Sequence, residues 1–454
     1  MEVTGSCHLL ESEGWRVLLD CGMHQGGDDI DRYKKERFAF RPAEIDAVIL
    51  SHAHLDHSGL LPKLIHGGFT GAIYCTPATR DLLAILLRDS FGLYSRDLEH
   101  ENLRRRRAGR ILLDAAYTRE DVDAVIDACV CHDYHEPFDA GPGLTVRFFD
   151  AGHILGSSIV RLDIDDEGSA KCLVYSGDLG GIDAVLMNDP ENPGPADVVM
   201  MESTYGDRNH RDIEQSIEEL TTILQETWAR RGNVIIPAFA VGRTQEILFH
   251  LGLMYHRGEL DNWHIFLDSP MAIAVTGVYD KWLELLADED IDRLMLRGKS
   301  TLEEFLPNLS LCESTEDSMA INRIKSGAII IAGSGMCTGG RVRHHIKHRI
   351  WNERNTMVFM GFQARGTLGR LLVDGVDTIR LYRETYAVKA RIETIGGFSA
   401  HAGQRELVRW LQQIEGDPRV LLVHGEERAL DALAGKLNEL GIDAHVAQPG
   451  EHGF

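Results

Sequence analysis

The sequence predicts an α/β protein in which a large sheet is interrupted by a second, inserted α/β unit. In the first 200 residues, short β-rich runs alternate with polar or helical stretches. From about residue 205 to 390 the order changes to amphipathic helix followed by apolar strand, and after that short strands carrying polar motifs return. A chain of 454 residues is long enough for two domains, because single hydrophobic cores seldom grow beyond about 250–300 residues.

The expected strands of the first part end in polar motifs. These runs are "WRVLLDCG", "DAVILSHAH", "GAIYCTP", "LTVRFFDAGH", "KCLVYSGD" and "DVVMMEST". In the middle part, "EQSIEELTTILQETWARRG" predicts an amphipathic helix, and "NVIIPAFAVG", "WHIFLDSP", "GAIIIAGSG" and "TMVFMGF" are typical of parallel strands buried on both faces. The functional side chains are therefore expected where strands end.

The charge of the chain limits the classes of partner. A formal net charge of −23 argues against nucleic-acid binding through a broadly basic surface. A polyanionic substrate would have to be held locally, by a metal site and a few arginines. The densest basic run, "RRRRAGR" at residues 104–110, is interpreted as a solvated helix face, with a substrate-facing patch as the competing interpretation. No apolar stretch approaches the about 20 residues of a membrane span, and the N-terminus lacks the pattern of a signal peptide, so we expect a cytoplasmic protein without membrane contact.

The stretch "SHAHLDHSG" at residues 51–59 carries the strongest chemical signal. His52 and His54 occupy alternate positions after a strand, and Asp56 and His57 begin the expected helix on the other side of a shared cavity. Imidazole nitrogens and a carboxylate oxygen are ligands that zinc prefers at neutral pH. The cluster therefore predicts two adjacent metal ions.

This H-x-H-x-D-H motif resembles the signature of the metallo-β-lactamase superfamily. Other strings follow in the order of that family: "LLDCG" supplies Asp20, "DAGHILGSS" supplies His153 and "VYSGDLG" supplies Asp178. The resemblance implies a metallo-β-lactamase αββα sandwich. It also implies a further strand ahead of "MEVTGS", which the sequence does not contain.

Three more strings resemble motifs of the β-CASP branch, the nucleases of the RNA 3′-end-processing type. They are "MESTYGDR" with Glu202, "GGFSAHAGQ" with His401 and "LLVHGE" with His424. In that branch a histidine at the position of His424 accompanies the RNA-acting members. The resemblance implies a metallo-β-lactamase domain at residues 1–203 and 389–454, an inserted β-CASP domain at 204–388, and an active site in the cleft between them.

The resemblance also implies a site with two Zn²⁺ ions per chain. Asp178 would bridge the ions, which share a water or hydroxide that attacks the phosphate in line. Asp20 would orient a metal-binding histidine. The remaining expected ligands are His52, His54 and His153 for one ion, and Asp56, His57 and His424 for the other.

Asp56, Asp178, Glu202 and His401 are the expected catalytic residues. His401 would stabilise the phosphate or protonate the leaving oxygen, with Glu202 hydrogen-bonded behind it. Ser334 and Arg341 are expected to contact the RNA backbone, because "GSGMCTGGR" lies between a strand and a helix and so presents backbone N–H groups. Arg243, in the string "PAFAVGRTQE", is a third candidate for such a contact. A tight turn without a ligand is the competing interpretation of the glycine-rich loop.

The leading functional hypothesis is a zinc-dependent ribonuclease that cuts single-stranded RNA, with an endonucleolytic mode favoured. A small-molecule metallo-hydrolase of the glyoxalase II or lactamase type would share the metal ligands but would need neither Glu202 nor His401. A non-catalytic scaffold and a DNA nuclease are two further hypotheses, and the sequence also allows a homodimer. The string "RHHIKH" at residues 343–348 is interpreted as a helix surface.

Overall fold

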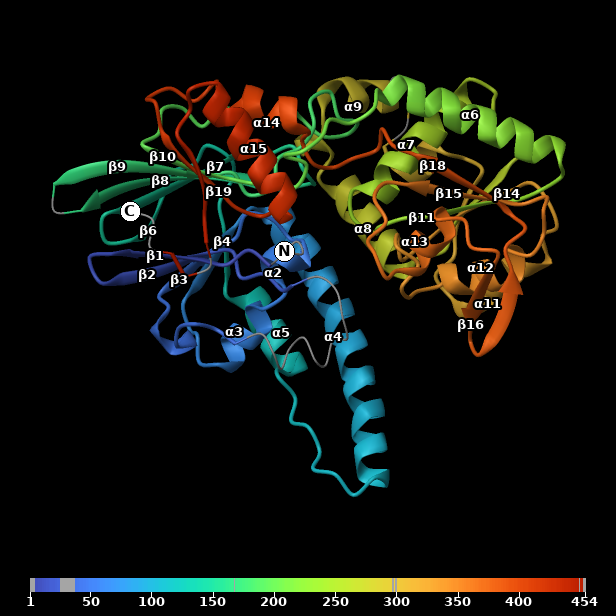
Figure 1. Ribbon diagram of the computed structural model, residues 1–454, viewed down its shortest axis with the longest axis horizontal. Helices are drawn as coiled ribbons and strands as arrows, with labels where there is room; N and C mark the ends of the chain where they lie inside the picture. The colour runs from blue at the N-terminus through green and yellow to red at the C-terminus, as the bar shows by residue number, and fades with distance from the viewer. Residues whose placement is uncertain are drawn as a thin grey trace. The chain divides into compact units, whose positions relative to one another are not determined.

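The computed structural model describes residues 5–24, 37–166, 168–295, 298, 300–448 and 450–451. The chain forms two compact units (Figure 1). The first unit consists of Met1–Asn209 and His401–Phe454, and the second of His210–Ala400. The second unit is thus an insertion into the first.

Two sheets form the centre of the first unit. In the first sheet, β1 is antiparallel to β2, and β2 to β5 are parallel in the order of the chain. Its strands are β1 (His8–Ser12), β2 (Trp15–Leu19), β3 (Ala47–Ile49), β4 (Ala72–Cys75) and β5 (Cys129–Cys131).

The second sheet has the strand order β20-β19-β10-β9-β8-β7-β6. Strands β6 to β9 are antiparallel neighbours, and β9, β10, β19 and β20 are parallel. The bounds are β6 (Phe138–Gly141), β7 (Leu144–Asp150), β8 (Ser158–Asp166), β9 (Ser169–Tyr175), β10 (Val198–Met201), β19 (Arg419–Leu422) and β20 (Ala444–Val446).

The two sheets pack face to face with helices outside them. Val17 and Ile49 of the first sheet share a buried core with Val146 and Met200 of the second. On the outer face of the second sheet, α14 and α15 form another buried core with β9, β10 and β19 (Figure 1). This αββα arrangement confirms the predicted fold class. The helices of the unit are α2 (Leu55–Ser58), α3 (Leu61–His66), α4 (Pro77–Arg107), α5 (Arg119–Asp127), α14 (Gln404–Leu411) and α15 (Glu427–Glu439).

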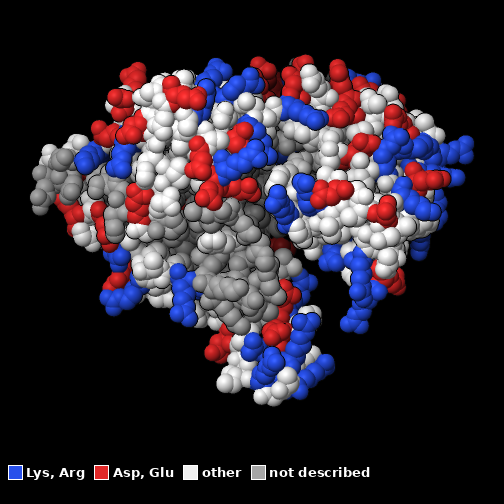
Figure 2. Space-filling model, viewed as in Figure 1, with Lys and Arg blue, Asp and Glu red and all other residues white. Residues whose placement is uncertain are grey.

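Helix α4 extends past the other elements of its unit and ends in a basic turn (Figures 1 and 2). Arg104, Arg106 and Arg107 are exposed there, where cations interact favourably with the C-terminal end of the helix dipole. These side chains are solvated, as both interpretations of the basic run require, and the choice between them stays a prediction. Within the described residues, no helix is long and apolar enough to cross a membrane.

The second unit is built on a parallel sheet with the strand order β13-β12-β14-β11-β15-β18. Successive side chains of β11 face opposite sides: Val234 and Ile236 lie in a core with α6 and α7, and Ile235 lies in a core with α12 and α13. Both faces are covered, which explains the uninterrupted apolar runs. The strands are β11 (Val234–Pro237), β12 (His264–Leu267), β13 (Leu309–Leu311), β14 (Ala328–Ala332), β15 (Thr356–Met360) and β18 (Arg391–Ile395).

A hairpin of β16 (Thr378–Leu381) and β17 (Glu384–Ala387) adds to the face of the sheet that α12 covers. The helices of the unit are α6 (Ile213–Ala229), α7 (Arg243–His256), α8 (Pro270–Lys281), α9 (Asp288–Met295), α10 (Leu302–Phe305), α11 (Thr315–Ala320), α12 (Val342–Arg349) and α13 (Leu368–Val373), with short 3₁₀ turns at η2 (Leu283–Leu285) and η3 (Ile321–Arg323). The first unit has such a turn at η1 (Pro42–Glu44).

Strand β18 belongs to the second unit. It pairs in parallel with β15 over five residues, and the chain re-enters the first unit at His401. The sequence-based expectation set this boundary at residue 388. Strand pairing across about 30 residues of chain decides where β18 lies, and the motif string "RIETIGGFSAHAG" does not reveal it.

Candidate metal centre and active site

The candidate side chains of the first unit collect at one edge of its sheets. Parallel strands end at the same edge, so residues that follow them are brought together. Each candidate follows a strand or begins the helix after it: Asp20 after β2, His52 to His57 after β3, His153 after β7, Asp178 after β9, Glu202 after β10 and His424 after β19.

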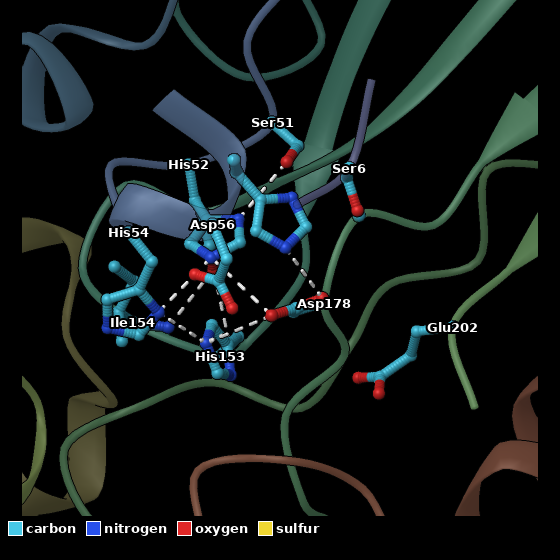
Figure 3. Close-up of polar contacts among 12 residues, drawn as sticks. Ser6, Ser51, His52, His54, Asp56, His153, Ile154, Asp178 and Glu202 are labelled. Carbon is cyan, nitrogen blue, oxygen red and sulfur yellow. Dashed lines mark hydrogen bonds and ion pairs between the residues drawn. The ribbon is translucent and has the colours of Figure 1, made fainter. Parts of the chain in front are cut away.

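The first cluster comprises His52, His54, His153 and Asp178 (Figure 3). His54 Nδ1 lies 3.2 Å from His52 Nε2 and 3.1 Å from His153 Nε2. Asp178 Oδ2 lies 3.6 Å from His52 Nε2 and 3.7 Å from His153 Nε2. One nitrogen from each ring and one carboxylate oxygen therefore converge on a single point.

The second cluster comprises Asp56, His57 and His424. His424 Nε2 lies 3.8 Å from Asp56 Oδ2. The other oxygen of Asp178, Oδ1, lies 3.2 Å from His57 Nε2 and 3.6 Å from His424 Nε2. Asp178 thus faces the first cluster with Oδ2 and the second with Oδ1, and the two clusters share it.

The residues of the clusters fit a cation. Among the described residues, the buried His424 Nε2 has no hydrogen-bond partner, and Asp178 Oδ1 faces it at 3.6 Å and His57 Nε2 at 3.2 Å. A lone pair buried without a hydrogen bond is costly, and a cation between these atoms removes that cost. Burial lowers the pKa of His52 well below its usual value and also lowers the pKa of His54. Both rings are therefore neutral at physiological pH, the form in which imidazole binds a metal.

Opposing effects determine the charges of the shared carboxylate and its neighbour. Burial alone raises the pKa of Asp178, but the rings of His57 and His424 hold it well below the usual range. Burial likewise opposes protonation of His57, whereas Asp178 and Asp20 raise its pKa well above the usual value. A cation in the second cluster would take the place of the proton on His57 Nε2, because both need the same lone pair.

Asp20 fixes the orientation of His57. Asp20 Oδ2 accepts from His57 Nδ1 at 2.6 Å and from the hydroxyls of Tyr175 and Ser51 at 2.6 and 2.7 Å. Asp20 Oδ1 accepts from the backbone N–H of Ser51 at 2.7 Å. With Nδ1 held in this way, Nε2 of His57 points at Asp178, the arrangement that orients a metal-binding imidazole.

Ser6 contacts the ring of His424 in the way that Asp20 contacts the ring of His57. The sequence around Ser6 contains no motif that predicts this contact. Ser6 Oγ lies 2.9 Å from His424 Nδ1, although the two residues are 418 positions apart. Backbone bonds position Ser6, since its N–H donates to Asp56 O and its carbonyl accepts from Gly22 N. Tyr175 was missed as well: its hydroxyl reaches Asp20 from a strand that reads only as apolar core.

Replacing Asp20 by asparagine is expected to weaken metal binding by about 10- to 100-fold. Asparagine has one acceptor oxygen, so its NH₂ group must face either His57 Nδ1–H or the N–H of Ser51. Competition with a chelator of known affinity measures the effect. Asp46→Asn is a matched control, because Asp46 also accepts a backbone N–H, from Arg16. Unchanged metal affinity in Asp20→Asn would contradict the orienting role.

His401 and Glu202 lie beside the shared carboxylate. His401 Nδ1 is 3.3 Å from Glu202 Oε1 and 3.9 Å from Asp178 Oδ2. The fully buried Glu202 is positioned by backbone donors, because Oε1 accepts from Leu179 N at 2.6 Å and Oε2 from Thr204 N at 3.2 Å. Burial opposes protonation of His401, but the Glu202 carboxylate raises its pKa to about 9. His401 is therefore an imidazolium at neutral pH in this arrangement, able to donate a proton.

The three residues expected to contact RNA all lie in the second unit, in different local settings. Arg243 begins α7, pairs with Glu246 at 2.6 Å and lies 5.7 Å from the Phe398 ring centre. Ser334 Oγ accepts from Gly339 N at 3.2 Å, so the glycine-rich loop uses some of its own donors. Arg341 donates to Asp268 Oδ1 at 2.7 Å and to two backbone carbonyls. These contacts favour a positioning role for Arg341, and its contact with RNA stays a prediction.

Family models match three consecutive parts of the chain. The metallo-β-lactamase superfamily model matches residues 2–126, the Beta-Casp domain model residues 244–372, and the model of a Zn-dependent metallo-hydrolase RNA specificity domain residues 385–447. The chain is also 41% identical over 451 residues to a protein named Ribonuclease TTHA0252 from Thermus thermophilus, covering 99% of this chain and 97% of that one. This chain belongs to the β-CASP branch of the metallo-β-lactamase superfamily.

Other β-CASP relatives are more distant. A protein named RNase J-like protein from Methanocaldococcus jannaschii is 31% identical, over 93% of this chain and 89% of its own length. Transcription termination factor FttA from Methanothermobacter thermautotrophicus is 34% identical over 94% of this chain, which spans 65% of that protein. The family and the clusters together establish a metal cofactor for this β-CASP protein.

Proposed function

We propose that this β-CASP protein is a zinc-dependent ribonuclease that hydrolyses phosphodiester bonds of single-stranded RNA endonucleolytically. The observation that carries the proposal is the pair of clusters that share Asp178, with His401 and Glu202 beside them. A hydrolase acting on a small ester needs the clusters alone. The similarity to a protein named a ribonuclease, over nearly the whole length of both chains, supports RNA as the substrate.

The proposed cofactor is two Zn²⁺ ions per chain. His52, His54 and His153 would hold one ion, and Asp56, His57 and His424 the other, with one oxygen of Asp178 for each. When bound, the ions supply an activated water and neutralise charge that builds on the phosphate. Imidazole-rich sets of this kind favour zinc over magnesium or calcium, which prefer oxygen ligands.

The side chains beside the clusters handle the proton. Because Nδ1–H of His401 faces Glu202 Oε1, the proton available to the substrate is the one on Nε2. Donating it to the leaving oxygen avoids expelling an unstabilised alkoxide. The carboxylate of Glu202 holds the ring in that orientation and stabilises its protonated form, which is the form required before the transfer.

The inserted domain is proposed to bind the RNA strand, with Arg243, Ser334 and Arg341 as the predicted contacts. The boundaries predicted from the sequence, 203/204 and 388/389, are proposed as the limits of the inserted β-CASP domain. The homodimer and the cytoplasmic location stay predictions.

An assay with end-labelled single-stranded RNA and DNA of the same sequence tests the function. The zinc-loaded chain is expected to convert RNA to internal fragments, to lose this activity with a chelator and to regain it with added Zn²⁺. Equal cleavage of DNA would favour a DNA nuclease. Hydrolysis of a thioester or lactam without cleavage of RNA would favour a small-molecule hydrolase and contradict the proposal.

A further inference from the structure

An exposed tyrosine surrounded by cations lies on the second unit, on elements to which the metal clusters do not belong. The predicted RNA contact Arg341 is the N-cap of one of these elements, helix α12. Tyr382 is in the turn of the β16–β17 hairpin, and its side chain is 45% exposed. Helix α12 lies beside it and carries the string "RHHIKH". The prediction of a helix surface is wrong for His345, which is buried and bonded to Asp268 at 2.6 Å, and right for His344 and His348, which are exposed.

The ring of Tyr382 is held by side chains of α12. The ring of His344 stacks on it with centres 5.1 Å apart and an interplanar angle of 21°, and the two also contact through Tyr382 Oη and His344 Nε2 at 3.2 Å. Arg343 and Lys347 lie one helical turn apart and place their charges 5.4 and 5.8 Å from the ring centre. The ring is therefore oriented, and the residue as a whole remains 45% exposed.

The charge of this region is opposite to that of the chain. Residues 341–391 contain eleven Lys and Arg and four Asp and Glu, whereas the whole chain has 47 and 70. Arg380 and Arg383 are exposed on the hairpin next to Tyr382. Figure 2 shows Lys and Arg side chains projecting at the end of this unit where Figure 1 draws β16.

Acidic neighbours do not neutralise the region. Glu384 is the acid of the hairpin, and it contacts Lys347 at 3.9 Å and the hydroxyl of Tyr386. Among the described residues, no carboxylate lies within 4 Å of the charged end of Arg343 or Arg383. The charges of Arg343 and Arg383 beside Tyr382 thus remain available to an anion, whereas the charge of Lys347 is shared with Glu384.

We infer that Tyr382, together with Arg343, Lys347 and Arg383, forms a second contact site for single-stranded RNA, on which one base stacks while the cations bind flanking phosphates. The chemistry supports a single strand, because an aromatic ring amid cations binds a base face and a backbone together, and a base paired within a duplex does not offer its face. The inference rests on the proposed function, since it gives the same substrate a second point of attachment.

Binding of a phosphorothioate-linked oligouridine of about 16 nucleotides to the full, zinc-loaded chain tests the site. Tyr382→Ala is expected to weaken binding by about 10-fold, since stacking on one aromatic side chain contributes that much. Tyr382→Phe keeps the ring and is expected to bind like the wild type. With cleavable RNA, Tyr382→Ala is expected to raise KM by a similar factor and leave kcat unchanged.

The cations are tested through the salt dependence of binding. Arg343→Ala with Lys347→Ala is expected to reduce the slope of log K against log salt by about 1.4, because each contact with a single strand contributes about 0.7. Arg257→Ala with Lys281→Ala is the matched control. It removes the same charge from the C-cap of α7 and from the last residue of α8, and Lys281 also lies over an aromatic ring, that of Trp282. The control is expected to leave the slope unchanged.

Two results would overturn the inference without touching the proposed function. One is wild-type RNA binding by Tyr382→Ala in a chain that cleaves RNA. The other is an equal loss of heparin binding and RNA binding in Tyr382→Ala. Heparin has no bases, so the site would then bind any polyanion through charge alone and Tyr382 would not stack on a base. A wild-type chain that neither binds nor cleaves RNA would overturn the proposed function itself.

Discussion

Replacing Asp178 by asparagine is expected to lower the zinc content from about two ions per chain to about one or fewer, and to reduce RNA cleavage on the order of 1,000-fold. Asp178 faces one cluster with each oxygen. Asparagine has nearly the same shape, so its oxygen can serve one cluster while its NH₂ group, which has no lone pair to offer, faces the other. Metal analysis by mass spectrometry and single-turnover cleavage measure both effects.

The same Asp-to-Asn change at another aspartate is the control for a general effect of the amide. Asp163 serves for this, because it lies on β8, next to the strand β9 that precedes Asp178, and pairs with Arg161 at 2.9 Å. Asp163→Asn is expected to keep both the zinc content and the cleavage rate. If Asp178→Asn also retained two ions under zinc-replete conditions, Asp178 would not be the shared ligand.

Replacing His401 by alanine is expected to cut RNA cleavage by on the order of 100-fold or more while zinc content stays normal, since general acid catalysis contributes that much. The change leaves all seven proposed ligands in place. His66→Ala is the matched control, because His66 also pairs with a carboxylate, that of Asp121 at 2.9 Å, on the surface of the same unit. Cleavage of RNA by His401→Ala at the wild-type rate would remove His401 from the mechanism.

Glu202→Gln is expected to reduce cleavage less than His401→Ala, and to reduce stability as well. Both oxygens of Glu202 accept a backbone N–H, from Leu179 and Thr204. The NH₂ group of glutamine must oppose one of these donors, which costs about 1–3 kcal/mol for a buried unsatisfied group. A lowered Tm with normal zinc content would accompany the loss of rate. Full wild-type activity would show that the charge of Glu202 does not act through His401.

The parallel strands could be predicted from the sequence because their physics is local. A strand covered on both faces needs an uninterrupted apolar run, and β10, β11, β14 and β15 have one. The polar motifs follow these apolar runs because the residues after a buried strand lie at the edge of the sheet, outside the apolar core. The position of β18 was harder to predict from the sequence, because polar and apolar residues do not alternate regularly along "RIETI". Only its pairing with β15 assigns β18 to the second unit.

Orientation within the site depended on contacts that no short window contains. Asp20 and His424 both have a positive φ, 60° and 48°, a conformation that non-glycine residues adopt only when the surrounding structure compensates its cost. These turns direct the side chain of Asp20 toward His57 and the side chain of His424 toward Asp178. Ser6 and Tyr175 fix these orientations by hydrogen bonds, but they come from other strands or loops and belong to no motif.

Side-chain identity and the two-residue period of a strand were enough to predict which side chains are candidate metal ligands. They were also enough to predict the order of these side chains along the chain and the strands that precede them. Three features could be learned only from the folded chain: which oxygen of Asp178 faces which cluster, which hydroxyl contacts His424, and that Tyr382 lies beside the cations of α12. Such contacts depend on sheet register, turn conformation and the packing of elements distant in the chain, and a sequence pattern does not encode these one residue at a time.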